Sequence, residues 1–424
     1  MVLHARVEIE SELVTGPMPK ANTQLLTAID LGSAKTCAVV AEITDTGLRY
    51  RGYGCADSRG MRKGLIADLD KAVVGLQKAV EEAEKQVGGP VEDAVVGVGG
   101  PHIRGVGSQG GINLGLRPRE ITRDDVRQAV EKARSIAMPA DRQMLHLLPQ
   151  EYMVDAQGGI HDPLGMVAKT LAVRVHVATA AASATQNAVI VLNKAGLHVD
   201  DTVLEPLACA DSVLRSDDRE LGVCLLDIGA GSTDLIVFHE GAVQHTGVVP
   251  VGGDHFTNDV AVGLRTPLAD AEKIKKQFGC AVVTQIPEYV EVEVPSIGEQ
   301  PPRMMSQRLL GEILEPRARE LMEMVRDHLR QAGVMELCGA GLVLTGGGAR
   351  LPGMLDVVDQ VLHRPARIGA PASIAGMPLE LAVPEFSTAI GLLLYAYRSR
   401  IARGVAEPSS LASRLKALWV KARA

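Results

Sequence analysis

The sequence predicts an α/β fold made of two similar domains that face each other. Three observations lead to this prediction. Residues 225–238 form two apolar runs joined by a glycine-rich turn, residues 25–43 repeat that pattern, and residues 341–354 contain a further glycine turn after an apolar run. A strand-turn-strand unit that occurs twice indicates duplication of a whole supersecondary structure. Two such units suggest two related domains that bind one ligand between them, so that binding is coupled to domain closure.

The second copy of the hairpin, residues 225–238, has the composition of a phosphate-binding turn. Two apolar, strand-like runs flank the turn, and its glycines let backbone N–H groups approach an anion. Asp227 ends the first strand, where its carboxylate can hold a hydrated Mg²⁺, and two hydroxyl groups supply donors. The candidate residues are Asp227, Gly229, Gly231, Ser232 and Thr233. An ordinary glycine-rich hairpin is the alternative when this copy is taken alone.

The first copy, residues 25–43, strengthens the phosphate-binding interpretation. Its Asp, Gly and Thr have the same spacing as those of the second copy, and each copy is followed by a further turn and strand. We therefore expect the two hairpins to bind the phosphates of one nucleotide from both sides, with Asp30 and Asp227 as the metal-binding carboxylates. The candidate residues of the first copy are Asp30, Gly32, Ser33, Lys35 and Thr36.

A third element, residues 341–354, indicates a buried strand that runs into a helix through three glycines, where the missing side chains let the backbone approach a base and a ribose. The two hairpins and this turn resemble the phosphate and adenosine motifs of the actin-like superfamily. With Glu205, Pro206 and a basic C-terminal segment, the chain from about residue 22 most resembles the FtsA family of bacterial cell-division proteins. The resemblance implies that ATP and Mg²⁺ are bound. It places the adenosine at Gly346, Gly347 and Gly348.

The resemblance also divides the chain into parts. Residues 99–177 intervene after the strand at 93–98, which matches the small α+β module that this family inserts at a position different from that of actin. The expected parts are a disordered extension at 1–22, a first core domain at 23–98 and 178–220 with a returning helix at 387–400, the inserted module at 99–177, a second core domain at 221–264 and 337–386, a small lobe at 265–336, a linker at 401–409 and an amphipathic helix at 410–424.

The resemblance also implies roles in catalysis and in nucleoside binding for two further sets of polar residues. Glu205 opens a helix where the superfamily places a residue that orients water toward the γ-phosphate, so it is the candidate general base of at most a weak ATPase. A carboxylate stabilised by the helix dipole is the alternative. On the helix that begins after Pro267, the ribose- and adenine-facing residues would be Glu272, Lys273 and Lys276, with exposed surface charge as the alternative.

The small lobe receives the C-terminal peptide of FtsZ in the FtsA family, and Arg303 and Arg308 are the candidates for contacts with its acidic groups. The resemblance further implies self-association into filaments, later division proteins as partners, and a role in tethering the FtsZ ring to the inner face of the cytoplasmic membrane at the division site. Two alternatives remain open. A sugar kinase or phosphatase of this superfamily would need a sugar-binding carboxylate constellation, which we do not identify, and the basic terminal segment disfavours a PilM-like pilus assembly protein.

The C-terminal segment has the pattern of a helix that lies in a membrane interface. Apolar residues fall on one narrow face of a helical wheel, cations flank that face, and the segment has no acidic residue. The candidate anionic-lipid contacts are Leu411, Arg414, Leu415, Lys416, Leu418, Trp419, Lys421 and Arg423. A helix docked on the protein's own core is the alternative.

Composition limits other classes of function. The chain has 424 residues, 46% of them hydrophobic, and a net charge of −7 without long charge runs, which argues against general nucleic-acid binding. The six cysteines show no CxxC spacing and predict reduced thiols, and the eleven histidines form no HExxH or comparable ligand pattern. Residues 105–110 satisfy GxGxxG, yet strand and turn follow instead of a helix, so we reject a dinucleotide site there.

Overall fold

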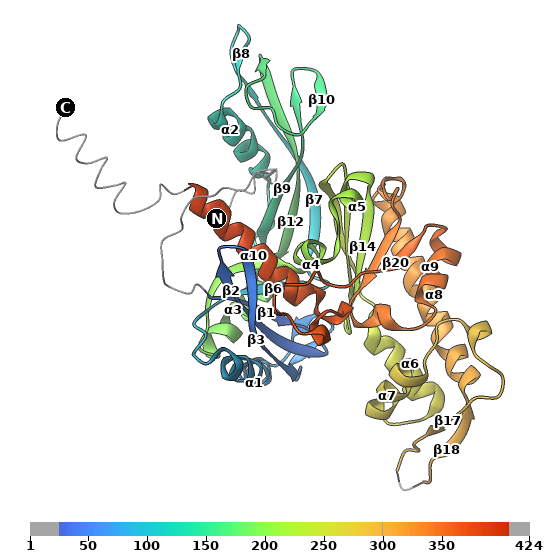
Figure 1. Cartoon of the computed structure of the whole chain (residues 1–424). Coiled ribbons are helices and arrows are strands. Elements are labelled where there is room, and N and C mark those ends of the chain that lie inside the picture. Colours follow the sequence, from blue (N-terminus) through green and yellow to red (C-terminus); the bar gives the residue numbers. More distant parts are fainter. Residues whose placement is uncertain (1–24, 299, 407–424) are drawn as a thin grey trace.

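The predicted α/β fold with two similar domains is confirmed by the computed structural model, which describes residues 25–298 and 300–406 (Figure 1). Each domain is built on a five-stranded sheet in which three antiparallel strands are continued by two parallel ones. In the first domain the order is β13 (His198–Leu204), β6 (Asp93–Val98), β1 (Leu25–Leu31), β2 (Lys35–Thr44) and β3 (Gly47–Asp57). In the second it is β16 (Ala242–Val249), β15 (Thr233–His239), β14 (Val223–Ile228), β19 (Leu342–Thr345) and β20 (Ala366–Ile368).

The duplicated hairpins match each other in register. Asp30 on β1 lies opposite Cys37 on β2, and Asp227 on β14 lies opposite the residue seven positions later on β15, Asp234. One step further along, Leu31 pairs with Thr36 in the first hairpin, as the equivalent residues do in the second. Each hairpin therefore presents its acidic residue and its glycine turn in the same way.

Helices cover both sheets and form the contact between the domains. In the first domain these are α1 (Leu69–Val87), α3 (Ala182–Lys194), α4 (Glu205–Val213) and α10 (Ser387–Ala406), with the two-residue strands β4 (Met61–Arg62) and β5 (Leu65–Ile66) before α1. Asp68 caps α1 through a bond to the N–H of Lys71, and Gly88 ends the helix with φ of 80°. Helix α10 packs on α4 and β1, and it continues to Ala406, past the expected boundary at residue 400.

The inserted module is a separate small α+β unit. Its elements are β7 (Arg104–Asn113), β8 (Arg119–Glu120), α2 (Arg123–Arg134), β9 (Arg142–Val154), β10 (Gln157–Ile160), β11 (Val167–Ala168) and β12 (Thr170–Ala181). The main sheet has the order β10-β9-β12-β7, and α2 packs on β7 and β12 (Figure 1). The glycines of the GxGxxG pattern lie within the continuous strand β7. A Cβ at Gly110 would be 2.1 Å from the backbone nitrogen of Ala133 on α2, so this glycine permits close helix packing.

The remaining helices belong to the second domain and its small lobe. They are α5 (Ser216–Leu221), α6 (Gly253–Leu264), α7 (Leu268–Phe278), α8 (Gln307–Gln331) and α9 (Met354–Leu362), with the short hairpin strands β17 (Glu291–Val294) and β18 (Arg303–Ser306). Five 3₁₀ turns join the described elements: η1 (Val283–Gln285), η2 (Met335–Leu337), η3 (Gly347–Arg350), η4 (Leu379–Leu381) and η5 (Pro384–Phe386). One hydrophobic core is shared by the sheet, α6, α7, α8 and α9.

The cysteines differ in part from the expectation of reduced thiols. Cys37 on β2 and Cys55 on β3 are register partners and form a disulfide, whereas the other four cysteines are free and buried. Sequence spacing does not reveal this pair, because the two residues meet only through the pairing of β2 with β3. Among the described residues, no helix is long and apolar enough to cross a bilayer.

The close crossing of α10 over α4 gives a test of the packing. Gly391→Ala should destabilise the chain by about 1–3 kcal/mol, because the new Cβ would lie 1.9 Å from the carbonyl oxygen of Ala208. Gly75→Ala on α1 is the matched control. Its Cβ would meet nothing nearer than 3.7 Å, and alanine favours helix by up to about 1 kcal/mol. Urea unfolding of both variants measures the difference, and equal stabilities would contradict the crossing.

Candidate functional site

The two hairpins, the 346–348 turn, α7 and η5 enclose a cavity of about 830 Å³ between the domains. Most of the residues selected from the sequence line it. These are Asp30, Gly32, Ser33, Lys35, Glu205, Asp227, Gly229, Gly231, Ser232, Glu272, Lys276, Gly346, Gly347 and Gly348. Segments that are more than three hundred residues apart in the sequence, such as those of Asp30 and Gly348, therefore meet at one place, as the duplicated-hairpin pattern predicts.

Three of the residues selected for nucleotide binding do not line the cavity. Thr36 and Thr233 are buried within β2 and β15, and the Thr233 hydroxyl donates to the carbonyl of Val251 at 2.8 Å, so it ties the hairpin to the following loop. Lys273 is exposed and pairs with Asp270 at 3.0 Å. Its direction follows from helix geometry, since a residue adjacent to Glu272 points about 100° away from it.

Lys275 is the residue that occupies the position expected for Lys273. It follows Glu272 by three positions and therefore shares its face of α7. Its Nζ lies 2.6 Å from Glu272 Oε2 and donates to the Gly253 carbonyl at 2.9 Å and to Thr257 Oγ1 at 2.8 Å. Helical spacing of three and four residues from Glu272 leads to Lys275 and Lys276, so both lysines could have been predicted from the sequence.

Four carboxyl groups gather where the two hairpins line the cavity: Asp30, Glu205, Asp227 and Asp234. Burial raises the pKa of Asp30 to about 6 and that of Asp234 to about 7, and it also raises the pKa of Asp227. Burial and then repulsion from the three aspartates raise the pKa of Glu205 well above its usual range. Such a concentration of buried oxygen ligands fits a hard divalent cation such as Mg²⁺.

Lys35 is the cation nearest this cluster. Burial lowers its pKa, while the neighbouring carboxylates, Asp30 first, act to raise it. Its Nζ lies 3.2 Å from the ring centroid of Phe386 on η5. Because Lys35 begins β2 immediately after the first turn, its ammonium group is near the place where phosphate oxygens would bind.

Asp234 was missed by the sequence reasoning. Its Oδ1 accepts the backbone N–H of Gly100 at 3.1 Å, and its Oδ2 accepts the Ser232 hydroxyl at 3.3 Å. Gly100 lies between β6 of the first core domain and β7 of the inserted module, so this hydrogen bond joins the second core domain to the start of the module. Alignment of the two hairpins by their strand register would have found Asp234, because the second hairpin has a carboxylate where the first has Cys37.

Glycines make room for these side chains at two points. A Cβ at Gly99 would lie 2.0 Å from Glu205 Oε2, so the absence of a side chain there lets Glu205 reach the cluster. Gly346 has φ of 80°, and a Cβ there would lie 2.3 Å from Asp227 Oδ1. Asp227 is also fixed by the Thr388 hydroxyl of α10 at 2.8 Å, while Ser387 bonds Thr345 at 2.7 Å.

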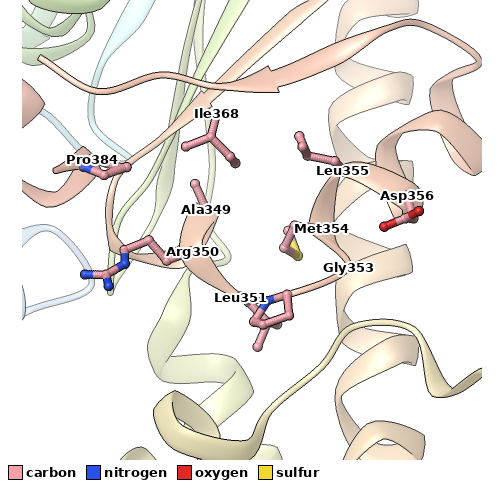
Figure 2. Close-up of a pocket in the computed structure, with 10 residues that line it drawn as sticks. Ala349, Arg350, Leu351, Gly353, Met354, Leu355, Asp356, Ile368 and Pro384 are labelled. Carbon is pink, nitrogen blue, oxygen red and sulfur yellow. The ribbon is translucent and has the colours of Figure 1, made fainter. Parts of the chain in front are cut away.

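A second hollow of about 390 Å³ adjoins this cavity (Figure 2). It is formed by residues 349–356 with Ile368 and Pro384, and its wall is mostly apolar. In Figure 2 the Arg350 side chain points away from Leu355 and Asp356, and it pairs with Glu385 at 2.5 Å. Arg350, Leu351, Pro352 and Pro384 line both spaces, so the hollow is a side extension of the cleft.

The selected partner-binding residues lie away from the cleft. Arg303 donates to the Leu264 carbonyl at 2.5 Å, and Arg308 pairs with Glu288 at 2.9 Å, so both side chains have partners within the chain. The eight selected membrane residues between 411 and 423 lie outside the described residues, as does the extension at residues 1–22.

Comparison with known proteins decides the family. The profile of a family described as "Cell division protein FtsA" matches residues 224–391, and that of "SHS2 domain inserted in FTSA" matches residues 100–179. Cell division protein FtsA of Pseudomonas aeruginosa is 40% identical over 378 residues, which are 89% of this chain and 90% of that protein. The chain belongs to the FtsA family of cell division proteins. FtsA of Escherichia coli (strain K12) is 36% identical over 94% of this chain and 96% of its own length.

The family assignment confirms the resemblance identified from the hairpins, and with it a function in cell division. The FtsA of Bacillus subtilis, 34% identical over 90% of this chain and 86% of its own length, extends the match to a further bacterium. These relatives do not favour the sugar kinase, phosphatase or PilM-like alternatives. The inserted FtsA module, matched at residues 100–179, coincides closely with the segment expected at 99–177.

Solved structures show the same fold at low sequence identity. The PilM-PilN type IV pilus biogenesis complex gives a TM-score of 0.64 with 18% identity, covering 88% of this chain and 98% of the matched chain. MreB 5 of Spiroplasma citri bound to AMPPNP gives 0.51 with 14% identity, covering 91% and 99%. At these identities the likeness concerns the actin-like fold alone, and it confirms that part of the expectation.

The raised carboxyl pKa values predict a pH dependence for the nucleotide-free chain. Asp234 has a pKa of about 7 in the fold against its ordinary 3.8, so its stabilising contribution is complete below pH 3.8 and is lost as the pH rises through 7. Asp234→Asn should therefore raise stability at pH 7.5 by at least about 1 kcal/mol, and by less at pH 5. Thermal unfolding at both pH values measures this, with exposed Asp356→Asn as the control. A melting temperature for Asp234→Asn that matches the parent at pH 7.5 would contradict the cluster.

Proposed function

We propose that this chain is the ATP-binding, self-assembling adaptor that tethers the FtsZ ring to the inner face of the cytoplasmic membrane at the division site. The observation that carries the proposal is the pair of matched hairpins whose carboxylates and glycine turns meet around one cavity. The family assignment supports a division role, and the cavity supports a nucleotide as the ligand that couples the two domains.

The residues of the cleft suit Mg·ATP. The phosphates would bind the backbone N–H groups of the two turns together with Lys35 and the turn hydroxyls, and Asp30 and Asp227 would hold Mg²⁺. A bound Mg²⁺ supplies positive charge that offsets both the phosphates and the buried carboxylates. The adenosine would lie along the glycine turn at 346–348, with Glu272, Lys275 and Lys276 on α7 facing its ribose and base.

Glu205 is the proposed general base of a slow hydrolysis. Its carboxyl lies in the wall of the cavity beside Gly99 and within the charge field of Asp30, Asp227 and Asp234. The raised pKa makes its ionised form dependent on a cation in the site, and a carboxylate there would accept a proton from water that attacks the γ-phosphate. Proton transfer would therefore be coupled to metal binding, which suits a weak ATPase.

The small lobe is the proposed site for the FtsZ C-terminal peptide. Arg303 and Arg308 lie on and just after β18, and the exposed apolar side chains Tyr289 and Met304 lie near them in the sequence. An acidic peptide would compete with the carbonyl and carboxylate groups that these arginines now contact, so apolar contacts would have to contribute to affinity. The inserted module is the proposed surface for contacts between copies, and later division proteins are expected further partners.

Membrane attachment is assigned to the basic segment at residues 410–424. Burying its three leucines and Trp419 contributes on the order of 6–8 kcal/mol, and its four cations add about 1 kcal/mol each near anionic lipid. Ordering the fifteen backbone units of this segment opposes this by roughly 1–2 kcal/mol each before helix hydrogen bonds form. Single copies should therefore bind weakly, and assembly would raise avidity by presenting many segments together.

The nucleotide site is tested by two substitutions. Asp227→Ala removes a carboxylate beside the metal, and Gly347→Asp adds a side chain and a negative charge where the nucleoside must approach, so each should weaken Mg·ATP binding by about tenfold or more. Gly347 has no atom closer than 3.4 Å to its added Cβ, so the fold should tolerate the change. Isothermal titration calorimetry measures both. The control is Asp359→Asn, an exposed position on α9 that lines neither hollow. If both variants bound ATP like the parent and this control, the site assignment would be wrong.

Membrane attachment is tested by sedimentation with anionic vesicles. Truncation after Ser409 should abolish co-sedimentation at a concentration where the parent pellets, and Trp419→Glu should reduce it strongly, because each removes apolar burial from the interface. Zwitterionic vesicles serve as the lipid control. A truncated chain that still pelleted, or that lost its cooperative unfolding transition, would identify the segment as part of the core.

A further inference from the structure

Three histidines that are distant in the sequence meet where the inserted module contacts the second core domain. His176 Nε2 on β12 lies 2.8 Å from Thr246 Oγ1 on β16, and His245 Nε2 on β16 lies 2.9 Å from His328 Nε2 on α8. The rings of His176 and His245 are 6.3 Å apart, and those of His245 and His328 are 5.1 Å apart. We call His176, Thr246, His245 and His328 the histidine joint. It connects three parts of the molecule, and it uses no residue of the cleft.

Two glycines make the joint sterically possible. A Cβ at Gly105 on β7 would lie 2.5 Å from His176 Cε1 and 2.7 Å from Thr246 Oγ1, and a Cβ at Gly247 would lie 2.2 Å from His328 Nε2. Gly107, two residues further along β7, would meet nothing within 4 Å. Gly105 is the first glycine of the GxGxxG pattern that the nucleotide site does not use, and this contact gives that glycine a physical role.

The joint supplies one polar connection between the module and β16, and Gln150 on β9 supplies another. The Gln150 amide donates to the carbonyl of Val243 at 2.9 Å. Gln150 does not titrate, so this connection is insensitive to pH. The histidines differ, because the neutral rings of His245 and His328 satisfy each other as donor and acceptor, whereas two protonated rings would bring two N–H groups together.

We propose that the histidine joint fixes the inserted module to the second core domain and α8, and that protonation of its histidines releases the module. The charged groups around it favour release. Each histidine has another histidine or Arg104 of β7 as a charged neighbour, whereas Arg326 and Asp327, beside His328 on α8, pair with each other at 3.0 Å. A proton on one ring is therefore opposed by its neighbours along the joint.

The titration of these rings sets the pH range. Burial lowers the pKa of His176 and His245 to about 4 from 6.5, and it also lowers that of His328. Because the closed joint takes up protons less readily than released rings, its contribution is complete above about pH 6.5 and is lost as the pH falls toward 4. At pH 5 the released rings of His176 and His245 would each favour the open form by about 20-fold relative to pH 7.

Hydrogen exchange measured by mass spectrometry on the full chain tests this proposal. We expect the protection of β7 and β12 amides, corrected for intrinsic rates, to fall by about tenfold or more between pH 7 and pH 5 in the parent. The triple variant His176→Gln/His245→Gln/His328→Gln has no titratable ring in the joint. Its β7 and β12 amides should therefore lose much less protection over the same pH range. Unchanged parental protection at pH 5, or an equal loss in both proteins, would overturn the proposal.

Two glycine-to-alanine variants on β7, one of which would clash with the joint, test the proposal without a change of pH. Gly105→Ala should lower the protection of β12 at pH 7, while Gly107→Ala on the same strand should retain the parental value. If the two variants behaved alike, the joint would not hold the module. ATP affinity should be unchanged in both, so failure here is distinguishable from failure of the proposed nucleotide site. If the module also carries contacts between copies, as the proposed function holds, Gly105→Ala should weaken self-assembly as well.

Discussion

Burial of four carboxyl groups around one cavity is the constraint on which the arrangement of the two domains depends. Burial raises the pKa of all four groups, and repulsion from neighbouring carboxylates raises it further for Asp30, Asp234 and Glu205. Lys35 is the nearby cation that lowers the pKa of Asp30 and Asp227. Without further positive charge, closing the domains brings like charges into a region of low dielectric. A cation bound in the site, as we propose, would change the sign of this contribution. The same residues would then oppose closure of the empty cleft and favour closure of the filled one.

The duplicated hairpins place one carboxylate on each domain at equivalent positions. Where the two hairpins differ in sequence, the two domains have different roles. The hairpins match in register, which sets Asp30 and Asp227 at equivalent positions on the two domains. Opposite these aspartates, the second strand of each hairpin has a different residue. The first hairpin has Cys37, which is bonded to Cys55, and the second has Asp234, which accepts a hydrogen bond from Gly100. On this side of the cleft, the second hairpin is thus joined to Gly100, which follows β6 at the start of the inserted module.

Sequence patterns predicted features that depend on local order. The hairpins, the glycine turn and the inserted module all follow from spacing along the chain, and the structure brings them together as expected. Features that depend on which strands pair, or on the angle between successive helical residues, were missed. The sequence prediction chose Lys273, whereas the structure places Lys275 in the cleft, because the face of α7 was assigned wrongly. Asp234 and the Cys37–Cys55 pair emerge only from strand register, and the three histidines of the joint share no sequence pattern.

Helix α10 has a mechanical consequence for how the cleft acts on the rest of the chain. Its first residues are bonded to the cleft, through Thr388 to Asp227 and through Ser387 to Thr345. With twenty residues it is about 30 Å long, and it packs along α4 and β1 before it ends at Ala406. A rod held at one end converts a small tilt into a larger sideways displacement at the other. A tilt of about 10° at Thr388 would move the far end by about 5 Å, so the position of Ala406 would depend on the state of the cleft.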